Sequence, residues 1–240
     1  MNKKIIIIPD VHGRIFWREI LKIENPEDYI FIFLGDYLDP YPDENIGSAT
    51  AFLEFLQILE FKKKYPNNVI LLIGNHDFHY INLYADRCSR FDRKNMSLYN
   101  SIFNKNKDLF QLTYATEDCL FSHAGLINKW LTTYNLEVYK TPIEVSNYLN
   151  KLYNEGDENS DIKRGLQLVS FYRGGFFNGS IIWRDVRESI NEDFYQVFGH
   201  TQLTKPYITD KFACLDCRKI FILEDKSIKE WCYEKQTSEN

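Results

Sequence analysis

The sequence lacks long hydrophobic runs and an excess of positive charge, and it contains few cysteines. No stretch among its 240 residues is long and apolar enough to span a bilayer, which takes about 20 consecutive apolar residues. The net charge of −5 argues against a general nucleic-acid or membrane surface. The five cysteines are an odd number, and they indicate reduced thiols in a cytoplasmic protein. Cys214 and Cys217 form a lone C-x-x-C pair, which favours two thiols near a hairpin over a zinc site.

Histidine is also scarce, and its placement is informative. Four of the five histidines follow short apolar runs that predict buried strands. The runs are Ile5–Ile8, Tyr29–Leu34, Val69–Ile73, Cys119–Ser122 and Tyr195–Phe198. They lead, in this order, to Asp10 with His12, Asp36 with Asp39, Asn75 with His76, His123, and His200. Scattered residues would not repeat this order, so we expect a metal site.

The order of elements predicts an α/β fold. A helix is expected to begin near Ser48 as its cap and to end before Pro66. A second helix is expected from Thr141, which begins a capping box, to about Asn154. Strands alternating with helices predict a mixed or parallel sheet covered by helices. We expect a single domain over residues 1–240, with helical insertions around 78–115 and 126–180.

The residue types at the strand ends favour transition-metal ions. Loops that follow parallel strands converge at one edge of a sheet, so residues far apart in sequence can meet there. Asp10 and His12 flank one residue and can point the same way, and Asp36 has two oxygens with which to bridge two ions. Oxygen and nitrogen donors without a thiolate suit manganese, iron, zinc, cobalt or nickel better than calcium. Two such ions would activate a shared water and neutralise phosphoryl oxygens.

A proton donor is also predicted. His76 follows Asn75 directly, and Asp39 lies three residues after Asp36 on the same loop. A carboxylate bonded to an imidazole favours its protonated form, so His76 is the expected general acid and Asp39 its orienting partner.

Taken together, the motifs resemble those of the calcineurin-like metallophosphoesterases. They are Asp-x-His, Gly-Asp-x-x-Asp, Gly-Asn-His-Asp, a lone His and Gly-His, and they span residues 10–201. Within that superfamily the chain is similar to the bacterial phosphoprotein-phosphatase and symmetrical diadenosine tetraphosphatase branch. The features are Phe121–Leu126, Ile181–Arg184 and the absence of a second His after His200. The resemblance implies a β-sandwich of two mixed sheets flanked by helices, with the active site at the carboxyl ends of strands.

The resemblance also implies roles for individual residues. Asp10, His12 and Asp36 would bind one metal ion, and Asp36, Asn75, His123 and His200 the other. The ions would be divalent transition metals, with Mn²⁺ expected first and Fe, Zn, Ni or Co as alternatives. A metal-bridging hydroxide would attack phosphorus, and His76 with Asp39 would supply the proton. Arg184 and Arg14 are the predicted phosphate-binding residues.

One departure from the branch concerns phosphate binding. The branch usually follows its second aspartate with Arg-Gly, and that arginine grips phosphate. Here Pro40-Tyr41 follows Asp39. The replacement has to come from elsewhere, and the candidates are Arg14, Arg87, Arg90, Arg93 and Arg173.

Several functions compete. The leading hypothesis is a phosphomonoesterase that acts on phosphoprotein, as Ser/Thr phosphatases do, or on a small phosphorylated metabolite. The alternatives are a dinucleoside polyphosphate hydrolase, and a nucleic-acid end phosphatase or phosphodiesterase, which the acidic charge weakens without removing. A non-catalytic scaffold of the same fold is the hypothesis from a different class, and the complete ligand set argues against it. The residues carry no signal for oligomeric state.

Overall fold

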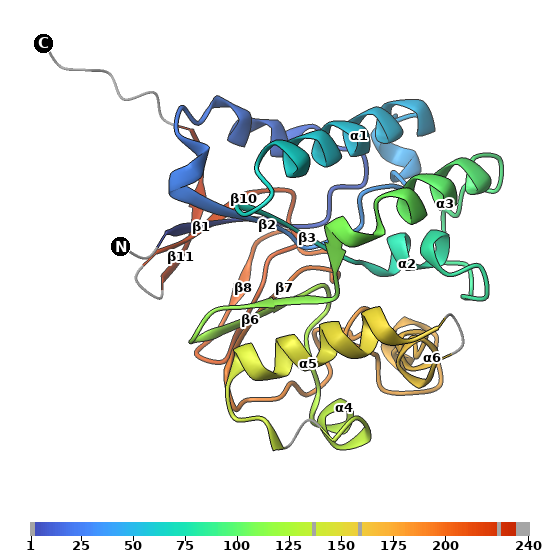
Figure 1. Cartoon of the computed structure of the whole chain (residues 1–240), viewed down its shortest axis with the longest axis vertical. Helices are drawn as coiled ribbons and strands as arrows, with labels where there is room; N and C mark the ends of the chain where they lie inside the picture. The colour runs from blue at the N-terminus through green and yellow to red at the C-terminus, as the bar shows by residue number, and fades with distance from the viewer. Residues whose placement is uncertain (1–2, 136–137, 158–159, 225–226, 234–240) are drawn as a thin grey trace, which may run out of the picture.

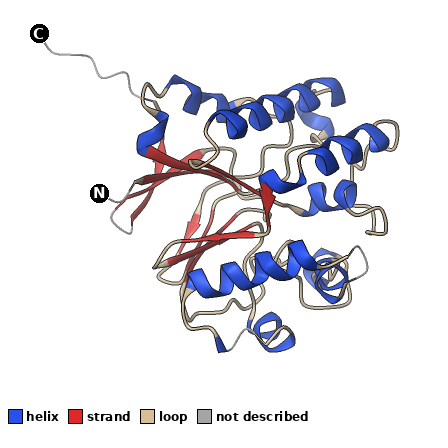
Figure 2. Cartoon of the chain, in the orientation of Figure 1, coloured by secondary structure: helices blue, strands red, loops and turns tan. Residues whose placement is uncertain are grey.

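Two β-sheets lie face to face between two layers of helices (Figure 1, Figure 2). The computed structural model describes residues 3–135, 138–157, 160–224 and 227–233. The predicted α/β fold with two mixed sheets flanked by helices is confirmed.

The first sheet has six strands and contains three of the predicted site strands. In spatial order the strands are β11 (Ser227–Trp231), β10 (Ile220–Glu224), β1 (Lys4–Ile8), β2 (Tyr29–Phe33), β3 (Val69–Leu72) and β4 (Phe110–Gln111). Strands β1 to β4 run parallel to one another, and β10 runs antiparallel to both of its neighbours, β1 and β11. The carboxyl ends of β1, β2 and β3 therefore open at the same edge.

The second sheet has five strands and contains the other two. Its order is β5 (Thr113–Ala115), β6 (Cys119–Ser122), β7 (Tyr195–Phe198), β9 (Phe212–Cys214) and β8 (Tyr207–Ile208). Strand β7 runs parallel to both β6 and β9. The loops after β6 and β7 thus also emerge together.

Successive side chains of a strand contribute alternately to two separate hydrophobic cores. Ile5 and Ile7 of β1 pack with Phe121 and Val197 of the second sheet. Their neighbours Ile6 and Ile8 face the other way, into the helix-covered core. Successive side chains of a strand point to opposite faces, which explains why these strands are continuous apolar runs.

Helices cover the outer faces of the sandwich. Their bounds are α1 (Ser48–Lys64), α2 (Asn75–Ile81), α3 (Met96–Lys105), α4 (Asn128–Thr133), α5 (Pro142–Glu155) and α6 (Asp161–Leu166). Helix α1 packs on β3, and α5 packs on β5 and β6 on the other side (Figure 1). The Thr141 capping box is present, but the cap of α1 is Gly47 and Ser48 is the first helical residue. The described residues include no helix with the length and apolar character needed to cross a membrane.

Candidate metal centre

The six predicted metal ligands meet at the carboxyl ends of β1, β2, β3, β6 and β7. All are buried, from His123 at 0% exposed to His200 at 7%. Ligand atoms of Asp10, His12 and Asp36 form one cluster, and those of Asp36, His123 and His200 form a second. Asp36 belongs to both, as the sequence predicts for a bridging residue. The structure thus brings together residues up to 190 positions apart, the separation of Asp10 and His200.

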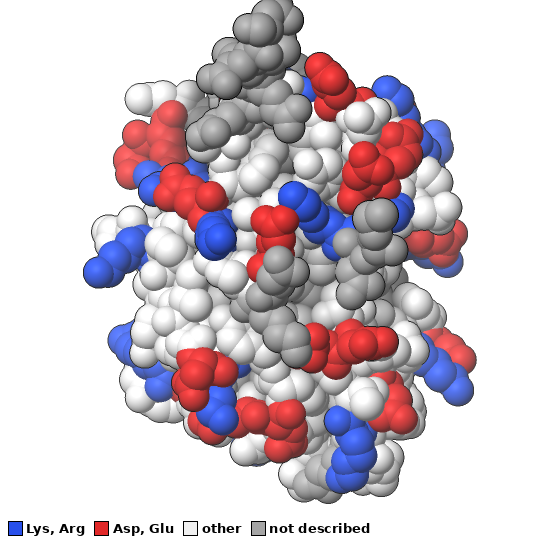
Figure 3. Space-filling view, turned by 90° about the vertical axis from the view of Figure 1, so that its left-hand side faces the viewer, with Lys and Arg blue, Asp and Glu red and all other residues white. Residues whose placement is uncertain are grey.

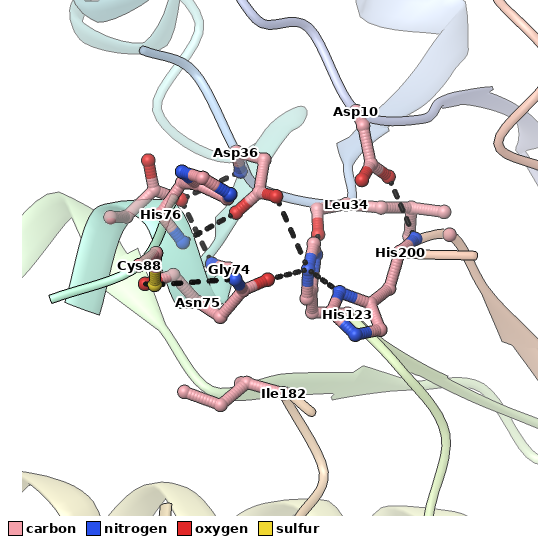
Figure 4. A network of polar contacts seen from close by, with 12 residues as sticks. Asp10, Leu34, Asp36, Gly74, Asn75, His76, Cys88, His123, Ile182 and His200 are labelled. Atoms are coloured by element: carbon pink, nitrogen blue, oxygen red, sulfur yellow. Dashed lines mark hydrogen bonds and ion pairs between the residues drawn. The ribbon is translucent and has the colours of Figure 1, made fainter. Parts of the chain in front are cut away.

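The second cluster converges on one imidazole nitrogen (Figure 4). His123 Nε2 lies 3.0 Å from Asn75 Oδ1, 3.0 Å from His200 Nδ1 and 3.6 Å from Asp36 Oδ2. His123 Nδ1 is 2.8 Å from the carbonyl of Leu34, so Nδ1 carries the proton in the neutral ring and Nε2 is bare. A bare nitrogen that faces two acceptor oxygens is unfavourable unless a cation lies between them. This donor set fits a transition-metal ion.

The first cluster repeats the arrangement around His12. His12 Nδ1 lies 2.8 Å from the carbonyl of Leu38, which leaves Nε2 bare at 3.5 Å from Asp36 Oδ2. The other oxygen of Asp36, Oδ1, accepts a hydrogen bond from the backbone N–H of His76 at 2.9 Å. Asp10 Oδ1 likewise accepts from the backbone N–H of His200 at 2.9 Å. Each carboxylate therefore has one oxygen that is held by a backbone N–H group.

The buried carboxylates of this site lack a positive counter-charge among the proposed ligands. Burial and the nearby charge of Asp10 raise the pKa of Asp36 well above its usual value. Burial also lowers the pKa of His12 and of His200 well below the usual value. Clustered buried carboxylates repel one another unless a counter-charge is present. Metal cations at the two clusters would supply it.

The backbone is held in an unusual conformation at the same residues. His12, Asp36, Asp39 and His200 have φ angles of 47°, 55°, 59° and 63°. Residues other than glycine seldom adopt this left-handed region, and such strain is concentrated at functional sites. Glycines permit the close approach, because a Cβ on Gly74 would collide with Asp36 Oδ1 and one on Gly199 with Asp10 Oδ1.

The predicted acid pair is formed at the edge of this centre. His76 Nδ1 lies 2.8 Å from Asp39 Oδ2. Burial alone would raise the pKa of Asp39, but hydrogen bonds with His76 and His79 lower it below its usual value. Burial lowers the pKa of His76 to about 4, although the Asp39 hydrogen bond opposes this shift. Negative charge entering the site would therefore favour the protonated ring.

Two residues that sequence reasoning missed hold Asp39 in place. The hydroxyl of Tyr80 donates to Asp39 Oδ1 at 2.5 Å. His79 Nε2 lies 2.9 Å from Asp39 Oδ2, the same oxygen that His76 contacts. Both come from α2, and His79 is one helical turn beyond His76. That spacing is the sequence signal that could have identified His79.

Asp77 ties together the loops after β2 and β3. Its carboxylate accepts from the backbone N–H groups of Asp36 at 2.7 Å, Gly74 at 2.8 Å and Tyr37 at 3.0 Å. Burial raises its pKa well above the usual value, and the charge of Asp36 adds to the shift. Asp216, between the two cysteines of the C-x-x-C pair, is also buried near the centre, where burial and Asp10 raise its pKa. No motif marked Asp216 in the sequence.

The two arginines predicted to bind phosphate already have partners. Arg14 Nε lies 2.8 Å from Glu44 Oε2, and its Nη1 donates to the carbonyl of Asp10 at 3.2 Å. Arg184 is 1% exposed. Its donors reach the backbone carbonyls of Ala124, Glu188 and Ser189 at 3.2, 2.7 and 3.3 Å. Phosphate binding by either residue stays a prediction.

Known proteins resemble this chain in sequence and in fold. The family model described as calcineurin-like phosphoesterase matches residues 3–218. Over 109 residues the chain is 35% identical to serine/threonine-protein phosphatase PP1-delta of Caenorhabditis elegans, covering 42% of this chain and 33% of that relative. The chain therefore spans only about a third of that relative's length.

Two solved structures have a similar fold. The cold-active protein-tyrosine phosphatase of a psychrophilic Shewanella species matches with a TM-score of 0.65 at 16% identity, over 97% of this chain and 78% of that one. A Saccharomyces cerevisiae protein serine/threonine phosphatase with similarity to human PP5 matches with a TM-score of 0.56 at 14% identity, over 98% and 82%. At these identities the likeness concerns the fold alone.

Proposed function

The chain belongs to the calcineurin-like phosphoesterase family, and from this premise we propose that it hydrolyses phosphate esters with two divalent metal ions. One observation carries the proposal. Asp36 Oδ2 lies 3.5 Å from His12 Nε2 and 3.6 Å from His123 Nε2, so one carboxylate oxygen stands between two ligand groups. This placement would let Asp36 contribute to the binding of both ions.

The proposal assigns separate metal-binding and proton-donating roles to residues of the site. Asp10, His12 and Asp36 would hold one ion, and Asp36, Asn75, His123 and His200 the other. When bound, two such ions lower the pKa of a shared water and neutralise phosphoryl oxygens. His76 would donate a proton to the leaving oxygen, and Asp39, 2.8 Å from its Nδ1, would keep the ring oriented. The nitrogen and oxygen donors include no thiolate, which suits manganese, iron, zinc, cobalt or nickel, and Mn²⁺ is our first choice among them.

The proposed substrate is a phosphate monoester, on a phosphoprotein as for Ser/Thr phosphatases or on a small metabolite. The name of the C. elegans relative supports the first option. Dinucleoside polyphosphates are the alternative. Nucleic-acid ends are disfavoured by the net charge of −5. On the face in Figure 3, which is the left-hand side of Figure 1, acidic and basic side chains are interspersed across the described part. None of the five cysteines forms a disulfide bond in the described structure, which fits the reducing cytoplasm that we propose as the location.

The test is turnover of p-nitrophenyl phosphate by protein stripped with a chelator and reloaded with manganese, nickel or iron. We expect hydrolysis in the reloaded protein and none in the stripped protein. Absence of turnover across neutral pH, with two metals bound by elemental analysis, would leave the non-catalytic scaffold as the better account. A panel of phosphopeptides, phosphorylated metabolites, diadenosine tetraphosphate and nucleic-acid ends would then rank the substrates.

A further inference from the structure

The loop between α2 and α3 places Arg90 over the centre. Arg90 Nε donates to the backbone carbonyl of Asp39 at 3.0 Å. Its Nη2 lies 3.2 Å from His76 Nε2 and 3.5 Å from His12 Nε2. The guanidinium therefore faces both the expected proton donor and an expected metal-ligand atom.

Tyr41 is the platform on which this guanidinium lies. The Arg90 Cζ atom is 3.7 Å from the centroid of the Tyr41 ring, which is close cation–π stacking. Tyr41 is held in turn by an edge-on contact with the ring of His12, with the ring centroids 5.1 Å apart. The Pro40-Tyr41 pair, which displaces the usual arginine, thus supplies the surface that positions Arg90.

Arg90 differs in its partners from three of the other four candidate arginines, and the fourth, Arg93, is exposed. Arg14 is paired with Glu44 at 2.8 Å and Arg173 with Asp185 at 3.3 Å. Arg87 donates to the carbonyls of His79 and Leu83. For Arg90, the described part of the chain provides no carboxylate ion pair.

The charge of Arg90 points to an anion as its ligand. A guanidinium has five N–H donors and no acceptor. The Nε of Arg90 donates to a backbone carbonyl and its Nη2 faces imidazole nitrogens, so neither contact is a charge pair. Its φ of 65° is a conformation that residues other than glycine seldom adopt. Strain of this kind is retained where a function depends on it.

We propose that Arg90, stacked on Tyr41, binds the phosphoryl oxygens of the substrate in place of the arginine that Pro40 displaces. The inference rests on the proposed function, since it assigns a residue to that same site. The planar fork of a guanidinium matches two phosphoryl oxygens at once. A phosphate monoester dianion is therefore the ligand that would form an ion pair with this guanidinium.

The test compares variants of the manganese-loaded protein. Arg90→Met removes the charge and donors, Arg90→Lys keeps only the charge, Tyr41→Leu removes the platform and Tyr41→Phe keeps it. Arg93→Met, an exposed arginine on the same loop, is the matched control. Three quantities are measured: the KM for p-nitrophenyl phosphate, the dissociation constant of orthophosphate by calorimetry, and the metal content.

We expect Arg90→Met to raise both constants on the order of 10- to 100-fold with two metals retained, as loss of a charge-assisted contact predicts. Arg90→Lys should raise both constants by a smaller factor than Arg90→Met. Tyr41→Leu should raise both constants roughly 2- to 30-fold, and Tyr41→Phe should raise them less because it keeps the aromatic face. Arg93→Met should match the unaltered protein. Unchanged constants in Arg90→Met would overturn the inference while leaving the proposed function intact.

The two proposals fail separately. If the unaltered protein hydrolyses no ester, the proposed function falls and orthophosphate titration alone decides on Arg90: weaker binding by Arg90→Met supports the inference, and equal binding overturns it. If Arg90→Met does not fold, the Tyr41 pair decides. A larger rise of the two constants in Tyr41→Leu than in Tyr41→Phe supports the inference, and equal values in the two variants overturn it.

Discussion

The metal-ligand side chains and the arginines around them reach the same centre from different parts of the fold. The ligands stand directly after buried strands and are fixed by backbone contacts. His12 is held by the carbonyl of Leu38, and His123 by that of Leu34, each at 2.8 Å. The sheets therefore set the positions of the ligands, and a change in a surface loop leaves them in place.

The arginines come from loops, and their roles depend on which partner each one finds. Arg14 meets Glu44, Arg184 meets backbone carbonyls, and Arg90 meets the Tyr41 ring. The same side chain is thus an ion-pair partner, a structural donor or an anion-binding group according to its surroundings. The difference teaches that the strands position the proposed metal ligands, while loops position the arginines that could bind substrate.

Asp36→Ala is the change with the largest expected effect. It tests the proposed metal ligands. Its carboxylate lies in both ligand clusters, so both ions should be lost together. We expect kcat/KM to fall on the order of 10⁴-fold, as when one member of a catalytic unit is removed. Elemental analysis and p-nitrophenyl phosphate assays measure the two effects. Asp43→Ala, an exposed carboxylate on the same loop, is the control, and two metals retained in Asp36→Ala would refute the bridging role.

His76→Asn separates the proton donor from the ligands. We expect kcat to fall on the order of 10³-fold with both metals kept, because general acid catalysis contributes about that much. His79→Asn should cost less, since His79 lies 2.9 Å from Asp39 and acts only through it. Metal analysis accompanies the kinetics. Full activity in His76→Asn would contradict the assignment of the acid.

The sequence predicted the ligand half better than the arginine half, for a physical reason. Parallel strands bring their carboxyl ends together, so motifs after Ile5–Ile8, Tyr29–Leu34 and Val69–Ile73 could be expected to meet, and the structure brings them together. Their role as ligands stays a prediction. The prediction of helix ends from single residues was less accurate. Ser48 was the expected cap of α1, but it is the first helical residue and Gly47 is the cap.

The position of Arg90 could not be read from its neighbours in sequence. The departure at Pro40 indicated that a phosphate-binding arginine had to come from elsewhere, and five candidates remained. The choice depends on Tyr41, 49 positions away, and on a loop that crosses the centre. Contacts of this kind come from tertiary packing and leave no periodic pattern in the chain.

Tyr80→Phe is a smaller and sharper test of the acid pair. It removes only the hydroxyl that donates to Asp39 at 2.5 Å. We expect kcat to fall by roughly tenfold, the value of one hydrogen bond to a charged group, with metal content unchanged. Tyr84→Phe, which alters an exposed tyrosine on the following loop, should have no effect. A kcat equal to that of the unaltered protein would show that Asp39 does not need this support.

Arg184→Met should affect activity least and stability most clearly. Its guanidinium donates to three backbone carbonyls, two of them through buried hydrogen bonds, and leaving a buried acceptor unpaired costs about 1–3 kcal/mol of unfolding free energy. Arg14→Met should cost less, because Glu44 keeps a second partner in Arg218 at 2.9 Å. Urea unfolding and the KM for p-nitrophenyl phosphate distinguish the two roles. A raised KM in Arg184→Met at unchanged stability would place Arg184 beside Arg90 as an anion-binding residue, and substrate binding would then include the segment between α6 and β7.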